Sequence, residues 1–177
     1  MTPPRYRSNP ANRDPEVIAH ARRVIALPKL WIGGDAILWN PPGPCKPSWW
    51  FTAQVEVLNS DLDDNVTVRG FFRPTTVPGA QDKLSFTLEH RGHRIVGIDT
   101  QAGSHTNFGG RTMPRYQPVV PSPQLHIPAD DVVYGYAEPL PEQTPSDHWQ
   151  TFLEQSNIQE APPYSPPQGL NRDLFLL

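Results

Sequence analysis

Two histidines lie within one polar stretch of the chain, residues 100–131, called the insert below, and a carboxylate directly precedes it. Asp99 precedes it, His105 lies in the segment SHTNFGG near its start, and His126 lies in PSPQLHIP near its end. Imidazole is the side chain whose unperturbed pKa lies closest to neutral pH, so two of them can serve as general base and general acid. If a sheet holds both ends of the insert, His105 and His126 come close together. The spacing therefore predicts a histidine-based site for acid–base catalysis.

Two other interpretations of these residues stay open at this point. His105 and Asn107 can form a turn, with His126 at the edge of a sheet and no chemistry at either residue. Alternatively, His105, His126 and Asp99 make up a set of two histidines and one carboxylate, a combination that binds metal ions. The sequence has no compact metal-binding spacing such as HExxH. We therefore predict neither a metal nor another cofactor.

The composition of the chain limits the functional classes and the cellular locations that we expect for the protein. The chain has 177 residues, of which 37% are apolar, and a formal net charge of −3. Nucleic-acid-binding proteins usually carry clustered Lys and Arg, and the sequence has no dense basic run. Its single cysteine, Cys45, allows neither an intramolecular disulfide nor a cysteine-based zinc site. The N-terminal segment lacks the apolar core of a signal peptide, and no apolar run reaches the roughly 18 residues of a membrane span. We expect a cytoplasmic protein without membrane contact.

Two amphipathic helices are predicted, one near each end of the chain. The first covers residues 15–26, because Asp14 is a good N-cap, Pro15 suits the first helical turn and Pro28 prevents continuation. The second covers residues 144–158 and begins with TPSD, in which the first and last residues can form a capping box.

Alternation of apolar and polar residues predicts strands over 49–58, 66–73 and 83–90. The Arg91-Gly92 pair predicts a hairpin that joins 83–90 to a strand over 93–99. Residues 30–39 also have strand character, broken near Gly33-Gly34 by a hairpin turn or a bulge. A further strand is predicted over 132–140. The insert has no regular pattern, and a stretch of this length inside a domain is usually functional or disordered.

Short connections between successive strands indicate a mainly antiparallel sheet. We expect an α+β fold with a twisted sheet of five to seven strands, an N-terminal and a C-terminal helix packed on it, and the long Pro-rich insert before the last strand. Residues 14–158 would form one domain, residues 1–13 a flexible arm and residues 159–177 a Pro-rich tail. The tail ends in DLFLL, an apolar candidate contact for a protein partner.

The C-terminal half resembles a family of uncharacterised bacterial and prophage proteins with the ordered pattern R-x-D, HtNPDG, HlHi, AYpl and FlxxcNI. The corresponding segments are GID (97–99), HTNFGG (105–110), PQLHIP (123–128), GYAEPL (135–140) and FLEQSNI (152–158). That family is distantly similar to TumE-like toxins of toxin–antitoxin loci. The chain differs from the pattern at Gly97, which stands for its Arg, at Phe108, which stands for its Pro, and at Gln124, which stands for its first His.

The resemblance implies a toxin or phage-defence protein that acts on RNA. His105 and His126 would then act as acid and base. Asn107 would orient a phosphate or a histidine, and Asp99 would fix the tautomer of an imidazole. The candidates for binding the phosphate and stabilising its developing charge are Arg94, Arg111 and Arg115.

The three departures from the pattern favour a second hypothesis. The chain would be a non-catalytic phage or prophage accessory protein that binds and inhibits or regulates a host or antitoxin protein. The net negative charge of the chain agrees with a protein that binds another protein and not nucleic acid. The tail 159–177 would supply the surface that contacts this partner.

Overall fold

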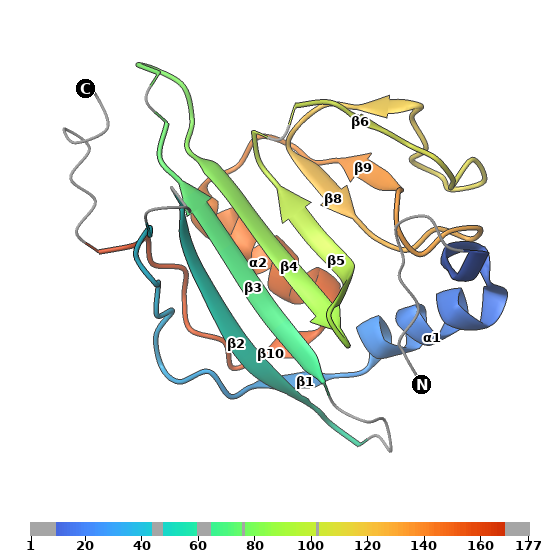
Figure 1. The fold of residues 1–177 in the computed structure, drawn as a ribbon, viewed down its shortest axis with the longest axis horizontal. Coiled ribbons are helices and arrows are strands. Elements are labelled where there is room, and N and C mark those ends of the chain that lie inside the picture. Colours follow the sequence, from blue (N-terminus) through green and yellow to red (C-terminus); the bar gives the residue numbers. More distant parts are fainter. Residues whose placement is uncertain (1–9, 44–47, 60–64, 76, 102, 169–177) are drawn as a thin grey trace.

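A large sheet and two helices make up the fold (Figure 1). The computed structural model describes residues 10–43, 48–59, 65–75, 77–101 and 103–168. The helices are η1 (Pro10–Arg13), α1 (Pro15–Ala26) and α2 (Pro145–Ser156). The strands are β1 (Lys29–Trp31), β2 (Trp49–Val57), β3 (Val66–Arg73), β4 (Lys83–His90), β5 (His93–Asp99), β6 (His105–Thr106), β7 (Val119–Val120), β8 (Gln124–His126), β9 (Ala137–Pro139) and β10 (Ile158–Gln159).

The main sheet has the strand order β10-β1-β2-β3-β4-β5-β8-β9, and all its pairs are antiparallel except β1 with β10. The predicted α+β fold is confirmed. The sheet has eight strands, one more than the predicted maximum, because two-residue and three-residue strands extend both of its edges. Strands β6 and β7 form a separate pair within the insert.

Both helices begin at the predicted caps. The Asp14 carboxylate accepts a hydrogen bond from the backbone N–H of Glu16. Thr144 and Asp147 form the predicted capping box, in which each side chain accepts from the other residue's backbone N–H. α2 ends two residues before the predicted boundary, because its C-cap Asn157 has a left-handed conformation with φ of 51°.

A buried lysine joins the C-terminal ends of the two helices. Lys29 is fully buried, and its Nζ donates hydrogen bonds to the carbonyls of Ile25, Leu27 and Ser156 at 3.0, 2.7 and 2.8 Å. The last carbonyls of a helix have no hydrogen-bond donor within the helix and carry partial negative charge. A lysine ammonium at this place supplies the missing donor and also balances the charge. Burial lowers the pKa of Lys29 to about 8.

Two predicted strands are much shorter than expected. The predicted break near Gly33-Gly34 is present, since Gly34 has φ of 87° and its carbonyl accepts from the indole N–H of Trp31. The strand ends at Trp31, and the prediction that it continues to residue 39 is wrong. Of residues 132–140, only Ala137–Pro139 forms a strand, because Gly135 has φ of 111° and interrupts the extended conformation. The local sequence resembled a strand at both places, but the pairing covers only part of each segment.

The two faces of the main sheet differ. One face is apolar and packs on α2, where Trp149 and Phe152 lie 4.8 and 5.7 Å from Phe86 between ring centroids. The other face, called the open face below, is turned toward the viewer in Figure 1, with α2 behind the sheet. Cross-strand partners project to the same face. Two neighbouring rows of such partners cross the open face, Thr52, Arg69, Thr87, Gly97 and His126 in one and Trp50, Phe71, Ser85, Asp99 and Gln124 in the other.

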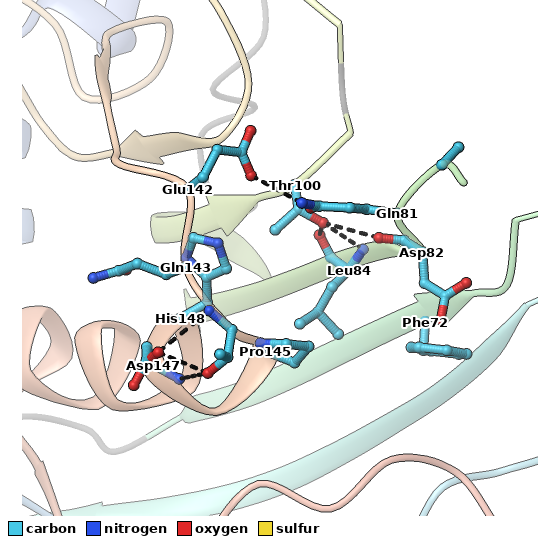
Figure 2. A pocket seen from close by; sticks show the side chains of 12 residues that line it. Phe72, Gln81, Asp82, Leu84, Thr100, Glu142, Gln143, Pro145, Asp147 and His148 are labelled. Carbon is cyan, nitrogen blue, oxygen red and sulfur yellow. Dashed lines mark hydrogen bonds between the residues drawn. The ribbon is translucent and has the colours of Figure 1, made fainter.

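A pocket of about 690 Å³ lies on the α2 side of the sheet, where β4 and α2 begin (Figure 2). Leu84 and Thr100 line it from the sheet, and Pro145 and His148 line it from the helix. Thr100 directly follows Asp99, and consecutive strand residues project to opposite faces. The pocket and the Asp99 carboxylate are therefore on opposite sides of the sheet.

The segments at both ends pack on this body. Asn12 donates to the carbonyl of Tyr134 and accepts from its N–H. The indole N–H groups of Trp149 and Trp39 donate to the carbonyls of Pro162 and Ser165, so part of the Pro-rich tail is held against the domain. The predicted contact segment DLFLL lies outside the described residues. No helix in the described ranges has the length and hydrophobicity needed to cross a bilayer.

Candidate functional site

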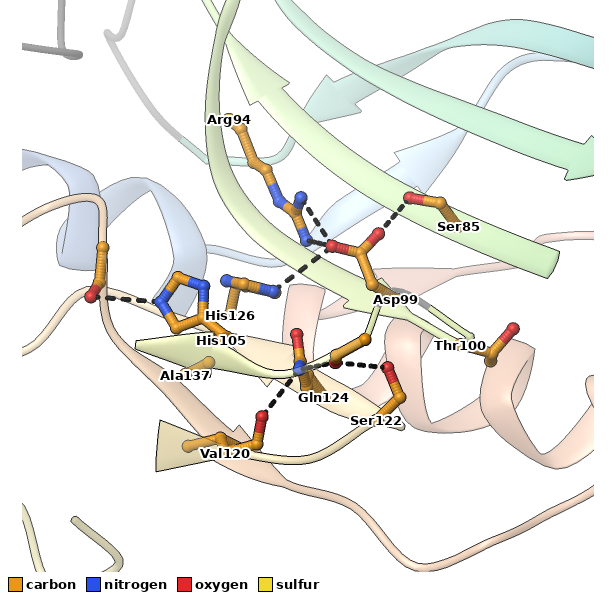
Figure 3. Close-up of polar contacts among 12 residues, drawn as sticks. Ser85, Arg94, Asp99, Thr100, His105, Val120, Ser122, Gln124, His126 and Ala137 are labelled. Atoms are coloured by element: carbon orange, nitrogen blue, oxygen red, sulfur yellow. Dashed lines mark hydrogen bonds and ion pairs between the residues drawn. The ribbon is translucent and has the colours of Figure 1, made fainter. Parts of the chain in front are cut away.

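The two histidines singled out from the sequence lie in contact. The ring centroids of His105 and His126 are 4.8 Å apart, with the rings nearly perpendicular at 87°. On its other side, His126 places Nε2 3.2 Å from Oδ2 of Asp99. Figure 3 shows His126 between His105 and Asp99. The expected approach of these three residues is thus present in the structure.

The sheet pairing explains this geometry. β8 pairs with β5 so that His126 lies opposite Gly97, and Gln124 lies opposite Asp99. Asp99 and His126 are therefore diagonal neighbours on the open face. β6 carries His105, whose Nε2 lies 3.3 Å from the carbonyl of Gly135.

Gln124 fixes the insert over this end of the open face. Its side-chain nitrogen donates to the carbonyls of Gly103 and Val120 at 2.8 and 2.9 Å. These two residues belong to the two arms of the insert, one before β6 and one in β7. Gln124 stands where the resembled pattern has a histidine, and here an amide holds the chain that carries His105.

Asp99 is the charged centre of the site. Both terminal nitrogens of Arg94 lie 3.0 Å from its Oδ2, and the Ser85 hydroxyl donates to its Oδ1 at 2.5 Å. Burial acts to raise the pKa of Asp99, but the contacts with His126, Arg94 and Ser85 outweigh it and hold the pKa well below its usual range. The carboxylate is therefore ionised at neutral pH, where it can stabilise a positive charge on His126.

A β-bulge brings Arg94 to this carboxylate. Leu88 pairs with Val96, but the next residue of β4, Glu89, pairs with Arg94, so that Ile95 is the extra residue of β5. Ile95 is buried in the core, and the bulge turns Arg94 to the open face. The side chain then lies over Gly97, where an added Cβ would come within 2.1 to 2.4 Å of the guanidinium atoms. The absence of a side chain at residue 97 creates the space that Arg94 occupies.

The environment of His126 favours its neutral form. It is 7% exposed, and neither ring nitrogen has a hydrogen bond of regular geometry among the described residues. Burial lowers the pKa of His126, Arg94 and His105 lower it further, and Asp99 opposes them. Two imidazoles in contact resist being protonated together. A neutral imidazole has one nitrogen that accepts a hydrogen bond and one that donates, so the neutral His126 ring can do both.

The Asn107 side chain, predicted to orient a phosphate or a histidine, contacts backbone groups of the insert and β9. Its side-chain nitrogen donates to the carbonyls of Gln117 and Ala137 at 2.7 and 2.9 Å, and its side-chain oxygen accepts from the N–H of Ala137 at 2.7 Å. Both amide hydrogens are thus used on backbone groups. Asn107 ties the insert to β9 and in this way supports the position of His105, two residues earlier.

Only one of the three predicted phosphate-binding arginines lies in the site. Arg94 contacts Asp99 as described. Arg115 instead forms an ion pair of 3.3 Å with Glu138 and donates to the carbonyl of Pro139. Arg111 is exposed in a turn of the insert.

Sequence reasoning missed two features of the site. Ser85, which donates to Asp99, lies on a strand whose alternation places it opposite the buried Leu84 and Phe86. That alternation predicts its face, but only the strand pairing shows what it contacts. The second feature is a pair of exposed aromatic side chains on the open face, Trp50 and Phe71, which are 37% and 44% exposed.

The site offers acid–base chemistry on a surface. In the described part of the chain, no group of three or more His, Cys, Asp and Glu side chains is arranged to hold a metal ion. The resemblance to the prophage family and to TumE-like toxins stays a prediction, because comparison of the chain with protein-family models, curated proteins and solved structures gave no match.

Proposed function

We propose that this protein is a cytoplasmic toxin or phage-defence protein that cleaves single-stranded RNA by acid–base catalysis without a metal ion. The observation that carries the proposal is the contact of His105 with His126, together with the Asp99 carboxylate behind His126. A proton-transferring imidazole backed by a second polar group that stabilises its charge is the usual arrangement of a general base. RNA suits such a site because its own 2′-hydroxyl supplies the nucleophile.

His105 is the histidine that contacts substrate in this mechanism, since its ring is half-exposed and His126 is buried. His105 takes the proton of the ribose 2′-hydroxyl while the 2′-oxygen attacks phosphorus. The bond from phosphorus to the 5′-oxygen breaks, and the His105 imidazolium returns its proton to that oxygen. The products are a 2′,3′-cyclic phosphate and a free 5′-hydroxyl. His126 and Asp99 act through His105, because they stabilise its charged form between the two proton transfers.

The open face supports single-stranded RNA as the substrate. Phe71 pairs across the sheet with both Trp50 and Ser85, and Ser85 pairs with Asp99, so the two exposed aromatic rings lie in the row that leads to the site. Aromatic side chains on a sheet stack unpaired bases without regard to sequence. Arg69 lies in the adjacent row and adds a cation, although it also pairs with Glu89 at 3.0 Å.

Cleavage of a labelled single-stranded RNA in excess EDTA tests the proposal. General acid–base groups typically contribute about 10²- to 10⁴-fold to rate, so His105→Ala should lower the cleavage rate at least about 100-fold with little change in Tm. His126→Asn should lower it as well. His20→Ala, which removes a half-buried histidine of α1, is the matched control and should retain full rate. Undiminished cleavage in both site variants would refute the proposal.

A second function is favoured by the charge of the site. Arg94 and Asp99 neutralise one another, as do Arg69 and Glu89, which leaves little net attraction for phosphate. Exposed Trp and Phe side chains are also typical anchors of protein interfaces. The alternative is a non-catalytic accessory protein that binds a host or antitoxin protein through the open face. In that case Phe71→Ser would abolish the effect that the expressed protein has on its host cell, and His105→Ala would leave that effect unchanged.

A further inference from the structure

The pocket between the start of β4 and the start of α2 is a second candidate site, independent of the histidine pair. Its volume of about 690 Å³ falls within the range of pockets that hold small organic molecules. Phe72, Leu84 and Pro145 give it apolar walls, and Gln81, Glu142 and Gln143 contribute polar groups (Figure 2). The pocket thus combines an apolar surface with a few polar groups, as ligand sites do.

Two buried polar atoms in the lining have no partner. His148 is 2% exposed, and its Nδ1 is buried without a hydrogen bond among the described residues. The same holds for Oε1 of Gln143. Burial lowers the pKa of His148 against the opposing effects of Glu142 and Asp147, so the imidazole is neutral at pH 7 and one of its nitrogens accepts a hydrogen bond. Native proteins rarely leave buried polar atoms unpaired, so these two atoms are hydrogen-bonding capacity that the described chain leaves unused beside the pocket.

The charge of the pocket indicates which partner fits. Three carboxylates, those of Asp82, Glu142 and Asp147, line it, and none of the described lining residues is Lys or Arg. Glu142 accepts a hydrogen bond from the Gln81 amide, and Asp147 accepts from the hydroxyl and N–H of Thr144. These donors are neutral, so they leave the negative charge of both carboxylates in place. An anionic ligand would be repelled here, and a cation would be attracted.

We propose that this pocket binds a small organic cation, with an ammonium or guanidinium group attached to an apolar body. The cationic group pairs with the Glu142 carboxylate, and the neutral His148 imidazole in the lining adds no competing positive charge. The apolar body packs against Phe72, Leu84 and Pro145. Such a ligand matches the negative charge of the lining and its apolar walls together.

Isothermal titration calorimetry of the full chain tests this proposal with phenethylammonium and phenylguanidinium as probes. Their neutral and anionic counterparts, 2-phenylethanol and 3-phenylpropionate, have a similar apolar body. We expect saturable binding of at least one cation, and at least about tenfold weaker binding of both counterparts, since a charge-assisted hydrogen bond is worth about that factor or more.

Glu142→Gln should weaken binding of the cation about tenfold or more. Glu142 is exposed, so this substitution should leave folding intact, which a Tm measurement checks. Glu154→Gln removes an exposed carboxylate of α2 that does not line the pocket and should leave binding unchanged. The proposal is overturned if neither cation binds at about 10 mM, if 3-phenylpropionate binds as tightly as they do, or if Glu142→Gln has no effect.

Discussion

Gly97→Ala is the smallest change that should disrupt the charged centre of the site. The added Cβ would lie 2.1 Å from a terminal nitrogen of Arg94, 2.2 Å from its Nε and 2.4 Å from its Cζ. These distances are far below van der Waals contact, so the guanidinium must leave its place. The backbone need not move, because the obstructing atoms are the end of a flexible side chain. The expected result is loss of both contacts between Arg94 and Asp99.

The size of the effect follows from the burial of the carboxylate. Asp99 keeps its Ser85 and His126 contacts but loses two charge-assisted hydrogen bonds of 3.0 Å in a setting where its side chain is 16% exposed. Removing one partner of such a pair typically costs about 1–3 kcal/mol. Gly97→Ala should therefore lower the free energy of unfolding by about 2 kcal/mol, as measured by urea denaturation. Because Arg94 lowers the pKa of His126, NMR titration should also show that pKa rising.

A double-mutant cycle isolates the cause. In an Arg94→Ala background the space over residue 97 is empty, and alanine in a strand loses less conformational entropy than glycine. Gly97→Ala should there stabilise the protein by about 0.5 kcal/mol, so that its effect changes sign. An equal destabilisation in both backgrounds would refute the reasoning, since it would mean that residue 97 conflicts with something other than Arg94.

Two further predictions concern stability. Lys29→Met should lower the free energy of unfolding by about 3 kcal/mol in urea, because it removes the donor to three carbonyls at the ends of the two helices, those of Ile25, Leu27 and Ser156. Lys83→Met, at an exposed position of β4, should change it by less than about 0.5 kcal/mol. The pKa values of His20, His93, His126 and His148 are all lowered in the folded state, chiefly by burial. The unfolded chain therefore binds more protons below about pH 6.5, and stability should fall between about pH 7 and pH 5. The slope should be smaller in His126→Gln, and a stability independent of pH over this range would contradict the assignment.

Local pattern was sufficient to predict the helices and the central strands. The capping box at Thr144 and the alternation in residues 49–58 depend on neighbours within a few positions, and both agree with the structure. The strand predicted over 30–39 ends at Trp31, before the glycine break that the sequence indicated, and the one predicted over 132–140 begins only after Gly135, whose φ is positive. The two-residue strand β10 is too short to produce a period, and it exists because the chain after α2 reaches the free edge of β1.

The site was predictable as a location and only partly as a set of contacts. His105, His126 and Asp99 come together because β8, a strand within the insert, pairs with β5, the strand that directly precedes the insert. The role of Asn107 was not predictable in this way, since its partners Gln117 and Ala137 are 10 and 30 residues away. Arg115 likewise has a partner that is distant in sequence, Glu138 of β9, and this ion pair competes with any role at the site.

Position 97 shows that a departure from a sequence pattern can be interpreted only from the contacts that the residue makes in the folded structure. The resembled pattern has Arg two residues before the aspartate, and Gly97 therefore looks like the loss of a cation. In the fold, the bulge at Ile95 turns Arg94 to the open face, and the missing side chain of Gly97 lets its guanidinium reach Asp99 from three residues further back. The two features depend on one another, because without the bulge Arg94 would project to the apolar face, and with a side chain at residue 97 it would be obstructed. A guanidinium beside the carboxylate is thus retained by a different route, and the sequence signal for it is the pair of Arg94 and Gly97 rather than either residue alone.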